Sequence, residues 1–145
     1  MIVLPLVSFA LDRFFLHSPL PVTALLGKWF VFWAAGVRLF TAGLKQFFQP
    51  EFTAKRIFHM TTGEALPVVR ELGIANIAVG AAGIISSWKP TFILPIALIA
   101  AIFYGVVGII HTHKKGKSKN ENIAMVTDLW VSLVLVAYLV TTLAG

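Results

Sequence analysis

Several charged residues stand inside segments that are otherwise rich in Leu, Ile, Val, Ala and Gly, among them Arg38, Glu71 and Asp128. A charge at the centre of a membrane helix costs about 2.5–3.5 kcal/mol on insertion scales, so such side chains usually face other helices and pair. Arginine stays protonated at any realistic pH, so it cannot escape this cost by losing its proton. We therefore expect Arg38 to pair with a carboxylate, with Asp128 as the first choice and Glu71 as the second.

Helical spacing places further polar residues beside these charges. Asp128 shares a helix face with Ser132, and Tyr104 shares one with His111, because residues three, four or seven apart lie on the same side of a helix. Two interpretations stay open for such a cluster. It is either a pairing that only holds helices together, or a site that carries protons, an ion or an anionic headgroup. The candidate intramembrane cluster comprises Arg38, Glu71, Asn76, Tyr104, His111 and Asp128.

Small residues recur along the second apolar segment at helical spacing. Gly73, Gly80 and Gly83 fall on one stripe with Asn76. Such stripes let membrane helices approach closely, and an Asn side chain can hydrogen-bond across the contact. We therefore assign Gly73, Gly80 and Gly83 to helix packing.

The sequence lacks the usual signatures of catalysis and metal binding. The chain has no Cys, which excludes disulfides, thiolate catalysis and Cys-ligated metal clusters. His111 and His113 lie among lysines, with no second group of ligands nearby, which is a poor site for a cation. No Ser, His and Asp arrangement with an oxyanion hole is evident. We predict no metal ion and no cofactor, and we favour a non-enzymatic protein over an enzyme.

The composition determines the class of protein. Of the 145 residues, 58% are hydrophobic and 12% are charged, and the mean hydropathy is +0.87. A soluble domain carries about 25% charged residues, so this chain has too few to cover its surface for water. The composition thus excludes a soluble globular enzyme and a disordered chain. It predicts an all-α integral membrane protein, folded as one domain over residues 1–145.

Apolar runs of about 20 residues, the length that crosses a hydrocarbon core of about 30 Å, indicate where the chain spans the membrane. Residues 1–16 are apolar but short, and we expect either a fifth, tilted span, which we favour slightly, or an interfacial helix. The fold class is therefore a bundle of four to five transmembrane helices. The link at residues 87–90 is so short that it predicts the second and third spans to be antiparallel neighbours. The main spans are expected at residues 21–48, 66–87, 91–110 and 123–143.

Basic residues are divided unevenly between the loops. Seven Lys and Arg side chains lie in or beside the loops 49–64 and 111–122, against Lys89 alone in the loop between them. Cytoplasmic loops carry an excess of Lys and Arg. We therefore expect a multi-pass protein of the cell inner membrane, with both basic loops and the polar cluster on the cytoplasmic side and the C-terminus extracytoplasmic. The net charge of +6 is explained by these loops, so the expected partner is the lipid bilayer and not a nucleic acid.

The loop 49–64 is expected to lie on the inner leaflet as a short amphipathic helix. Its basic face should favour anionic lipid. Its alternating apolar and basic side chains are Phe52, Ile57, Phe58 and Met60 on the one hand and Lys55, Arg56 and His59 on the other.

Four segments give the chain a familiar appearance: residues 28–40, 49–58, 69–77 and 120–129. Together they resemble a family of small, uncharacterised prokaryotic multi-pass membrane proteins, known only as a domain of unknown function. The resemblance implies a small helical membrane protein and adds no chemistry. More loosely, the segment 43–50 is similar to the corresponding part of DoxX-type four-helix proteins, some of which accompany quinone-linked oxidoreductases.

Several functions are compatible with this sequence. The first is a non-enzymatic membrane protein that binds or passes a small solute, an ion or a lipid headgroup through the polar cluster. The second is a DoxX-like membrane partner of a quinone-linked oxidoreductase, and the third is a membrane enzyme that acts on a lipophilic substrate. The small-residue stripe and the small size of a single bundle also predict a homo-oligomer.

A pair of reporters tests the topology. A reporter fused after Gly145 should be extracytoplasmic, and one inserted near Gly116 should be cytoplasmic, because the fourth span alone separates the two points. Alkaline phosphatase and green fluorescent protein activities measure the two sides. Finding both reporters on one side would contradict the span assignment.

Overall fold

The computed structural model describes residues 2–57, 63–114, 116, 117 and 119–144, and every regular element in them is a helix. Four helices are long and apolar enough to span a membrane. The protein therefore has the all-α architecture of an integral membrane bundle. The spanning helices are Val22–Phe48, Ala65–Ile85, Pro90–His113 and Glu121–Leu143.

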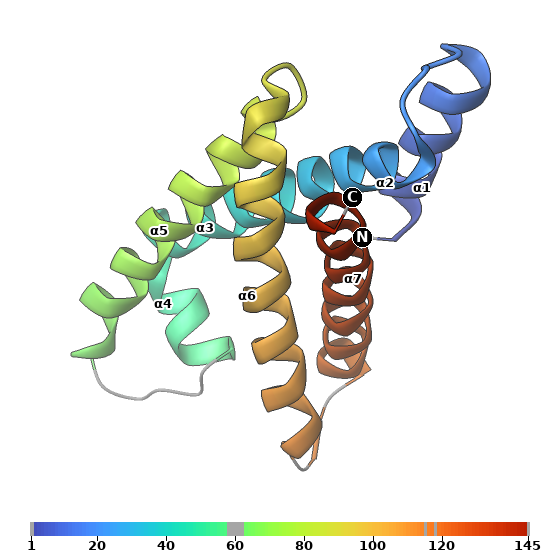
Figure 1. The fold of residues 1–145 in the computed structure, drawn as a ribbon. Coiled ribbons are helices and arrows are strands. Elements are labelled where there is room, and N and C mark those ends of the chain that lie inside the picture. The colour runs from blue at the N-terminus through green and yellow to red at the C-terminus, as the bar shows by residue number, and fades with distance from the viewer. Residues whose placement is uncertain (1, 58–62, 115, 118, 145) are drawn as a thin grey trace.

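The first spanning helix, Val22–Phe48, is continuous but changes its winding twice. It consists of α2 (Val22–Phe30), the π-helical η2 (Val31–Arg38) and α3 (Leu39–Phe48). At about 1.5 Å per residue its 27 residues measure about 40 Å. That exceeds a hydrocarbon core of about 30 Å, so the helix has to tilt in a bilayer. Figure 1 shows it lying across α6 and α7.

Prolines mark several of the boundaries between elements, as expected of a residue that starts helices and cannot continue them. Pro21 precedes α2, Pro50 begins α4, and Pro90 begins η4. The remaining elements are α1 (Val3–Ala10), the π-helical η1 (Leu11–Phe15), α4 (Pro50–Phe52), η3 (Thr53–Ile57), α5 (Ala65–Ile85), η4 (Pro90–Phe92), α6 (Ile93–His113) and α7 (Lys119–Leu143).

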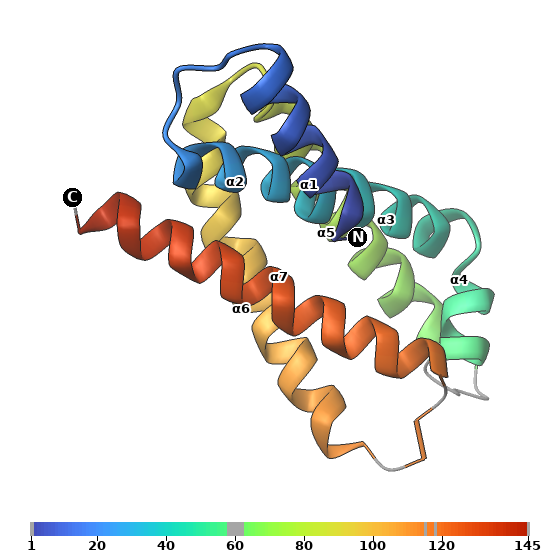
Figure 2. The same ribbon diagram turned by 90° about the vertical axis from the view of Figure 1, so that its right-hand side faces the viewer.

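The helices pack as two hairpins. The first spanning helix packs along α5, and α6 packs along α7, while α2 and η2 contact α6 and α7 and so join the two hairpins. The expectation that the second and third spans are close neighbours is wrong. α5 and α6 meet at the short turn near Ser86 and then diverge (Figures 1 and 2), because the close-packing face of α5 is turned to the first spanning helix.

Glycines explain why α5 prefers the first spanning helix. Gly73, Gly80 and Gly83 are buried on the face of α5 that meets it, opposite Gly36 and Gly43. A Cβ on Gly83 would lie 2.6 Å from the backbone nitrogen of Gly36. The stripe is therefore occupied within one chain, so it no longer supports the prediction of a homo-oligomer, which stays untested.

The interior between the hairpins is apolar. Its members come from the first spanning helix, α6 and α7, and they include Phe30, Val31, Ala34, Ala35, Ile96, Ala97, Ala100, Ala101, Val131 and Leu135. The outer faces are also apolar: on α6 alone Leu98, Ile99, Ile102, Val106, Ile109 and Ile110 are exposed. Exposed apolar surface on this scale is unusual in water. It is the surface expected of helices that face lipid.

The segment before the first spanning helix is too short for a fifth span. α1 and η1 together cover Val3–Phe15, or about 20 Å at 1.5 Å per residue. His17 then adopts a left-handed conformation with φ of 51°, which ends the helix before Pro19 and Pro21.

The amphipathic helix expected over residues 49–64 is described in part. Its first half forms α4 and η3, which are helical up to Ile57. Phe58, His59 and Met60 lie outside the described residues.

Replacing Gly83 tests the glycine contact. Gly83→Ala should lower the free energy of unfolding by about 1–3 kcal/mol, the usual cost of overpacking, because backbone atoms of Gly36 stand in the way. Gly63→Ala is the control, since a Cβ at this described position would meet nothing within 4 Å. Thermal unfolding in detergent measures both variants. Equal stability of Gly83→Ala and wild type would contradict the packing.

Candidate functional site around Arg38 and Asp128

Arg38, Tyr104 and Asp128 come together from three different helices. Arg38 is the last residue of η2, and its Nη1 donates a hydrogen bond to Oδ1 of Asp128 on α7 over 2.6 Å. The guanidinium carbon lies 4.8 Å from the centroid of the Tyr104 ring on α6. The Tyr104 hydroxyl donates to the carbonyl oxygen of Ala34 over 2.5 Å. We call Arg38, Tyr104 and Asp128 the arginine cluster.

The π-helical segment η2 positions two members of this cluster. A π-helix replaces the i→i+4 hydrogen bonds of an α-helix by i→i+5 bonds, and such segments occur frequently at functional sites. The Ala34 carbonyl that accepts from Tyr104 lies inside η2, and Arg38 ends it. Compared with a regular α-helix, this winding turns the Arg38 side chain to a different direction and presents a different carbonyl oxygen to Tyr104.

The ion pair is buried on one side and open on the other. The Asp128 side chain is 4% exposed, whereas the Arg38 side chain is 24% exposed. A guanidinium has five N–H groups, and one N–H of Arg38 donates to Asp128. The open side of the guanidinium thus keeps donors for another acceptor.

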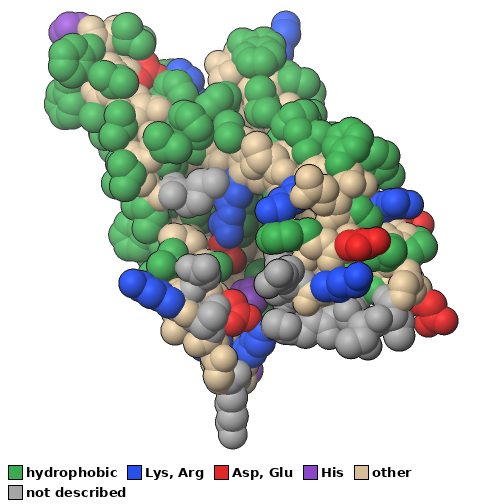
Figure 3. Space-filling model, turned by 180° about the vertical axis from the view of Figure 1, so that it is seen from behind, with side chains coloured by type: hydrophobic (Ala, Val, Ile, Leu, Met, Phe, Trp, Pro, Cys, Tyr) green, Lys and Arg blue, Asp and Glu red, His purple; other side chains and the backbone are tan. Residues whose placement is uncertain are grey.

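The arginine cluster lies near the middle of the bundle, displaced toward its more charged end. Each member stands within about one or one and a half helical turns, roughly 4–8 Å, of the centre of its spanning helix. The displacement is toward the end where α3 leads to α4 and α6 leads to α7 (Figure 2). Figure 3 shows Lys, Arg, Asp, Glu and His side chains around a hollow in this half, below a mostly apolar upper half.

Fully buried apolar side chains close the cluster toward the opposite end. Ala34 and Ala35 precede Arg38 by about one helical turn, and Val131 and Leu135 follow Asp128 by about one and two turns. All four have exposed fractions of 0%. The cluster therefore has an apolar floor and is approached from the charged end.

His111 and the basic loop form the rim of this approach. His111 is half-buried near the end of α6. Its backbone carbonyl accepts a hydrogen bond from Lys117 Nζ over 2.9 Å. Lys114 pairs with Glu121 across the connection from α6 to α7. These contacts fix the end of α6 against the beginning of α7.

Two residues of the sequence-based candidate cluster lie apart from the arginine cluster. Glu71 is exposed on α5, so Asp128, the favoured carboxylate, is the one that pairs with Arg38. Asn76 is buried, and its Nδ2 donates to Oε1 of Gln46 over 2.8 Å. Asn76 thus joins α5 to α3 as a packing residue, and its partner Gln46 was not anticipated from the sequence.

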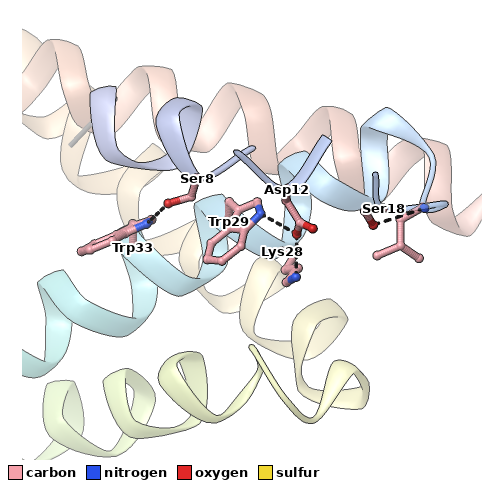
Figure 4. Close-up of polar contacts among 7 residues, drawn as sticks. Ser8, Asp12, Ser18, Lys28, Trp29 and Trp33 are labelled. Atoms are coloured by element: carbon pink, nitrogen blue, oxygen red, sulfur yellow. Dashed lines mark hydrogen bonds and ion pairs between the residues drawn. The ribbon is translucent and has the colours of Figure 1, made fainter. Parts of the chain in front are cut away.

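A second polar group, which the sequence analysis missed, attaches the N-terminal helix (Figure 4). Asp12 is 5% exposed, and its Oδ2 accepts from Lys28 Nζ over 2.7 Å and from Trp29 Nε1 over 3.0 Å. Trp33 Nε1 donates to the Ser8 hydroxyl over 2.9 Å. Lys28 is therefore paired with Asp12. We call these five residues the N-terminal clasp. In the sequence, the i, i+4 spacing of Ser8 and Asp12 could have indicated a polar helix face there.

Metal binding finds no basis in the described part of the chain. There, no three His, Cys, Asp or Glu side chains come together as a metal ion would require. The carboxylate of Asp128 is instead taken up by Arg38.

Comparison with known proteins gives a family without an assigned activity. A family described as "Family of unknown function (DUF6790)" matches residues 1–144. No curated protein and no solved structure matches the chain. The resemblance to a family of unknown function is thereby confirmed. A prokaryotic origin and the likeness to DoxX-type proteins gain no support from these comparisons.

A double-mutant cycle measures how far the pair holds the fold together. Arg38→Met and Asp128→Asn should each destabilise the detergent-solubilised protein by about 3–5 kcal/mol, because each leaves a buried partner uncompensated. The double variant should recover much of that loss. Lys55→Met is the control, since the exposed Lys55–Glu51 pair is worth about 1 kcal/mol or less. Additive losses in the double variant would show that the two side chains do not interact.

Proposed function

The chain belongs to the DUF6790 family of unknown function, and on that premise we propose that it is a binding protein of the membrane. Its ligand is a small solute or lipid whose polar group is held at the arginine cluster. Four apolar helices of spanning length support a position of this cluster inside the bilayer. The polar group enters from the charged end of the bundle.

The half-open ion pair is the observation that carries this proposal. A purely structural ion pair would shield both side chains from solvent. Here the Arg38 side chain stays 24% exposed, whereas the Asp128 side chain is 4% exposed. Asp128 and the Tyr104 ring hold the guanidinium in one orientation. A fixed guanidinium binds carboxylate, phosphate or carbonyl oxygens through parallel hydrogen bonds.

Binding is favoured over passage by the apolar floor of the cluster. Ala34, Ala35, Val131 and Leu135 have no exposed surface, so they leave no room for water beneath the ion pair. An ion or polar solute that crossed this layer would lose its hydration without replacement. A solute therefore enters and leaves on the same side.

The topology proposed from the basic loops accompanies this function. The elements α4 and η3, which follow α3, lie at the same end of the molecule as the last turns of α6 (Figures 1 and 2). With an excess of Lys and Arg in these loops, the positive-inside rule puts the open side of the arginine cluster toward the cytoplasm, in a multi-pass protein of the cell inner membrane.

Arg38→Lys separates binding from folding. Lysine keeps the positive charge beside Asp128 but loses the planar fork and the stacking on Tyr104. We expect thermal stability near that of wild type and at least a tenfold loss of the compound that copurifies with the wild-type protein, measured by mass spectrometry of extracts from lipid nanodiscs. Lys55→Gln, at an exposed position, should retain it.

Two results would contradict the proposed function. Equal recovery of all extracted compounds from wild type and Arg38→Lys would show that Arg38 holds no ligand. Ion flux through vesicles containing the wild-type protein, above that of empty vesicles and abolished by Asp128→Asn, would show passage instead of binding.

A further inference from the structure

The N-terminal helix of α1 and η1 makes its side-chain hydrogen bonds to the first spanning helix from one side. Ser8 and Asp12 lie four residues apart and so share a helix face. They meet Trp33 and Trp29, which are also four residues apart on the first spanning helix. Pro5, on the same helix, is buried as well. Ser8 and Asp12 therefore have their hydrogen-bond partners on the first spanning helix.

Away from these contacts, the exposed side chains of the same helix are apolar apart from Arg13. Large hydrophobic side chains project from it without any covering element among the described residues, and several are about half to three-quarters exposed. They are Val3, Leu4, Leu6, Val7, Leu11, Phe14, Phe15 and Leu16. Their surface is of the same kind as the outer face of α6, which belongs to a spanning helix.

The contacts also fix the direction and the depth of the helix. From Asp12 back to Ser8, the contact on the first spanning helix moves forward from Trp29 to Trp33, so the two helices run antiparallel. Continuing this register brings Val3 to the level of Arg38, near the middle of the spanning helix Val22–Phe48.

The other end of this helix lies beside the turn between α5 and α6. Leu20 and Ala24 line a cavity of about 270 Å³ together with Ser86, Ser87 and Pro90. Figures 1 and 2 show the α1–α2 connection and the α5–α6 turn at the same end of the molecule. Arg13 and His17 are exposed there, as expected where a chain leaves the hydrocarbon core.

We propose that α1 and η1 form a half-spanning helix embedded in the bilayer, with the N-terminal clasp against the first spanning helix and the apolar face against lipid acyl chains. It enters from the side of the α5–α6 turn and reaches about the depth of the arginine cluster. Its length of about 20 Å is too short to cross about 30 Å of hydrocarbon. This arrangement is independent of any ligand at Arg38.

Site-directed spin labelling tests the embedding directly, because the chain has no Cys. Val7→Cys and Leu11→Cys carry nitroxides on the apolar face, in vesicles of phosphatidylcholine and phosphatidylglycerol. Ile102→Cys, exposed at the middle of α6, is the matched control for acyl-chain contact. Both N-terminal labels should resemble it, with high accessibility to oxygen and low accessibility to an aqueous nickel chelate.

A second measurement establishes the side of entry. A membrane-impermeant maleimide should modify His17→Cys and Lys89→Cys from one side of the membrane and Lys55→Cys from the other. Nickel accessibility at Val7 equal to that at Lys89 would overturn the proposal, because the helix would then lie in water. Val3→Cys modified from the side of Lys55 would show a complete span. Labels shielded from both reagents, with disulfides forming between two chains, would show that a second copy covers the face.

Discussion

A guanidinium cannot lose its proton, so inside a bilayer it requires a carboxylate or other hydrogen-bond acceptors. In this protein Arg38 stands near the middle of the longest spanning helix and is satisfied by Asp128 on α7 and by the face of Tyr104 on α6. Each of the two hairpins contributes to this contact. The same interaction therefore joins the halves of the bundle and creates the polar site between them. Removing it would affect folding and binding together.

The remaining polar contacts follow the same rule on a smaller scale. Asp12 with Lys28, Asn76 with Gln46, and the Ser132 hydroxyl with the Ala101 carbonyl each join two helices. In lipid, interhelical hydrogen bonds and close packing replace the hydrophobic effect as the source of association. The glycines of α5 supply the close packing, and the polar pairs determine which helices meet and in what register.

Sequence patterns were sufficient for the class of fold and for the central pair. Apolar runs of spanning length indicated the helices, and the polar helix face that Asp128 shares with Ser132 indicated it as the first partner for Arg38. The π-helix at Val31–Arg38 was not predictable, because it contains no Pro and because the bond from Tyr104 to its Ala34 carbonyl is a tertiary contact that the local sequence does not show. The divergence of α5 and α6 was missed because a short turn fixes where two helices meet but not their angle. Glu71 was included because its depth was estimated from the sequence alone.

Solid-state NMR in lipid bilayers measures the Arg38–Asp128 contact most directly. With ¹⁵N in the guanidinium groups of the four arginines and ¹³C in the side-chain carboxyls of the two aspartates, Arg38→Met identifies the contribution of the pair. A strong nitrogen–carbon dipolar coupling at the Asp128 carboxyl, lost in Arg38→Met, is the predicted result. Two results would contradict the account: no coupling at the Asp128 carboxyl in the wild-type protein, or a coupling there that Arg38→Met leaves unchanged.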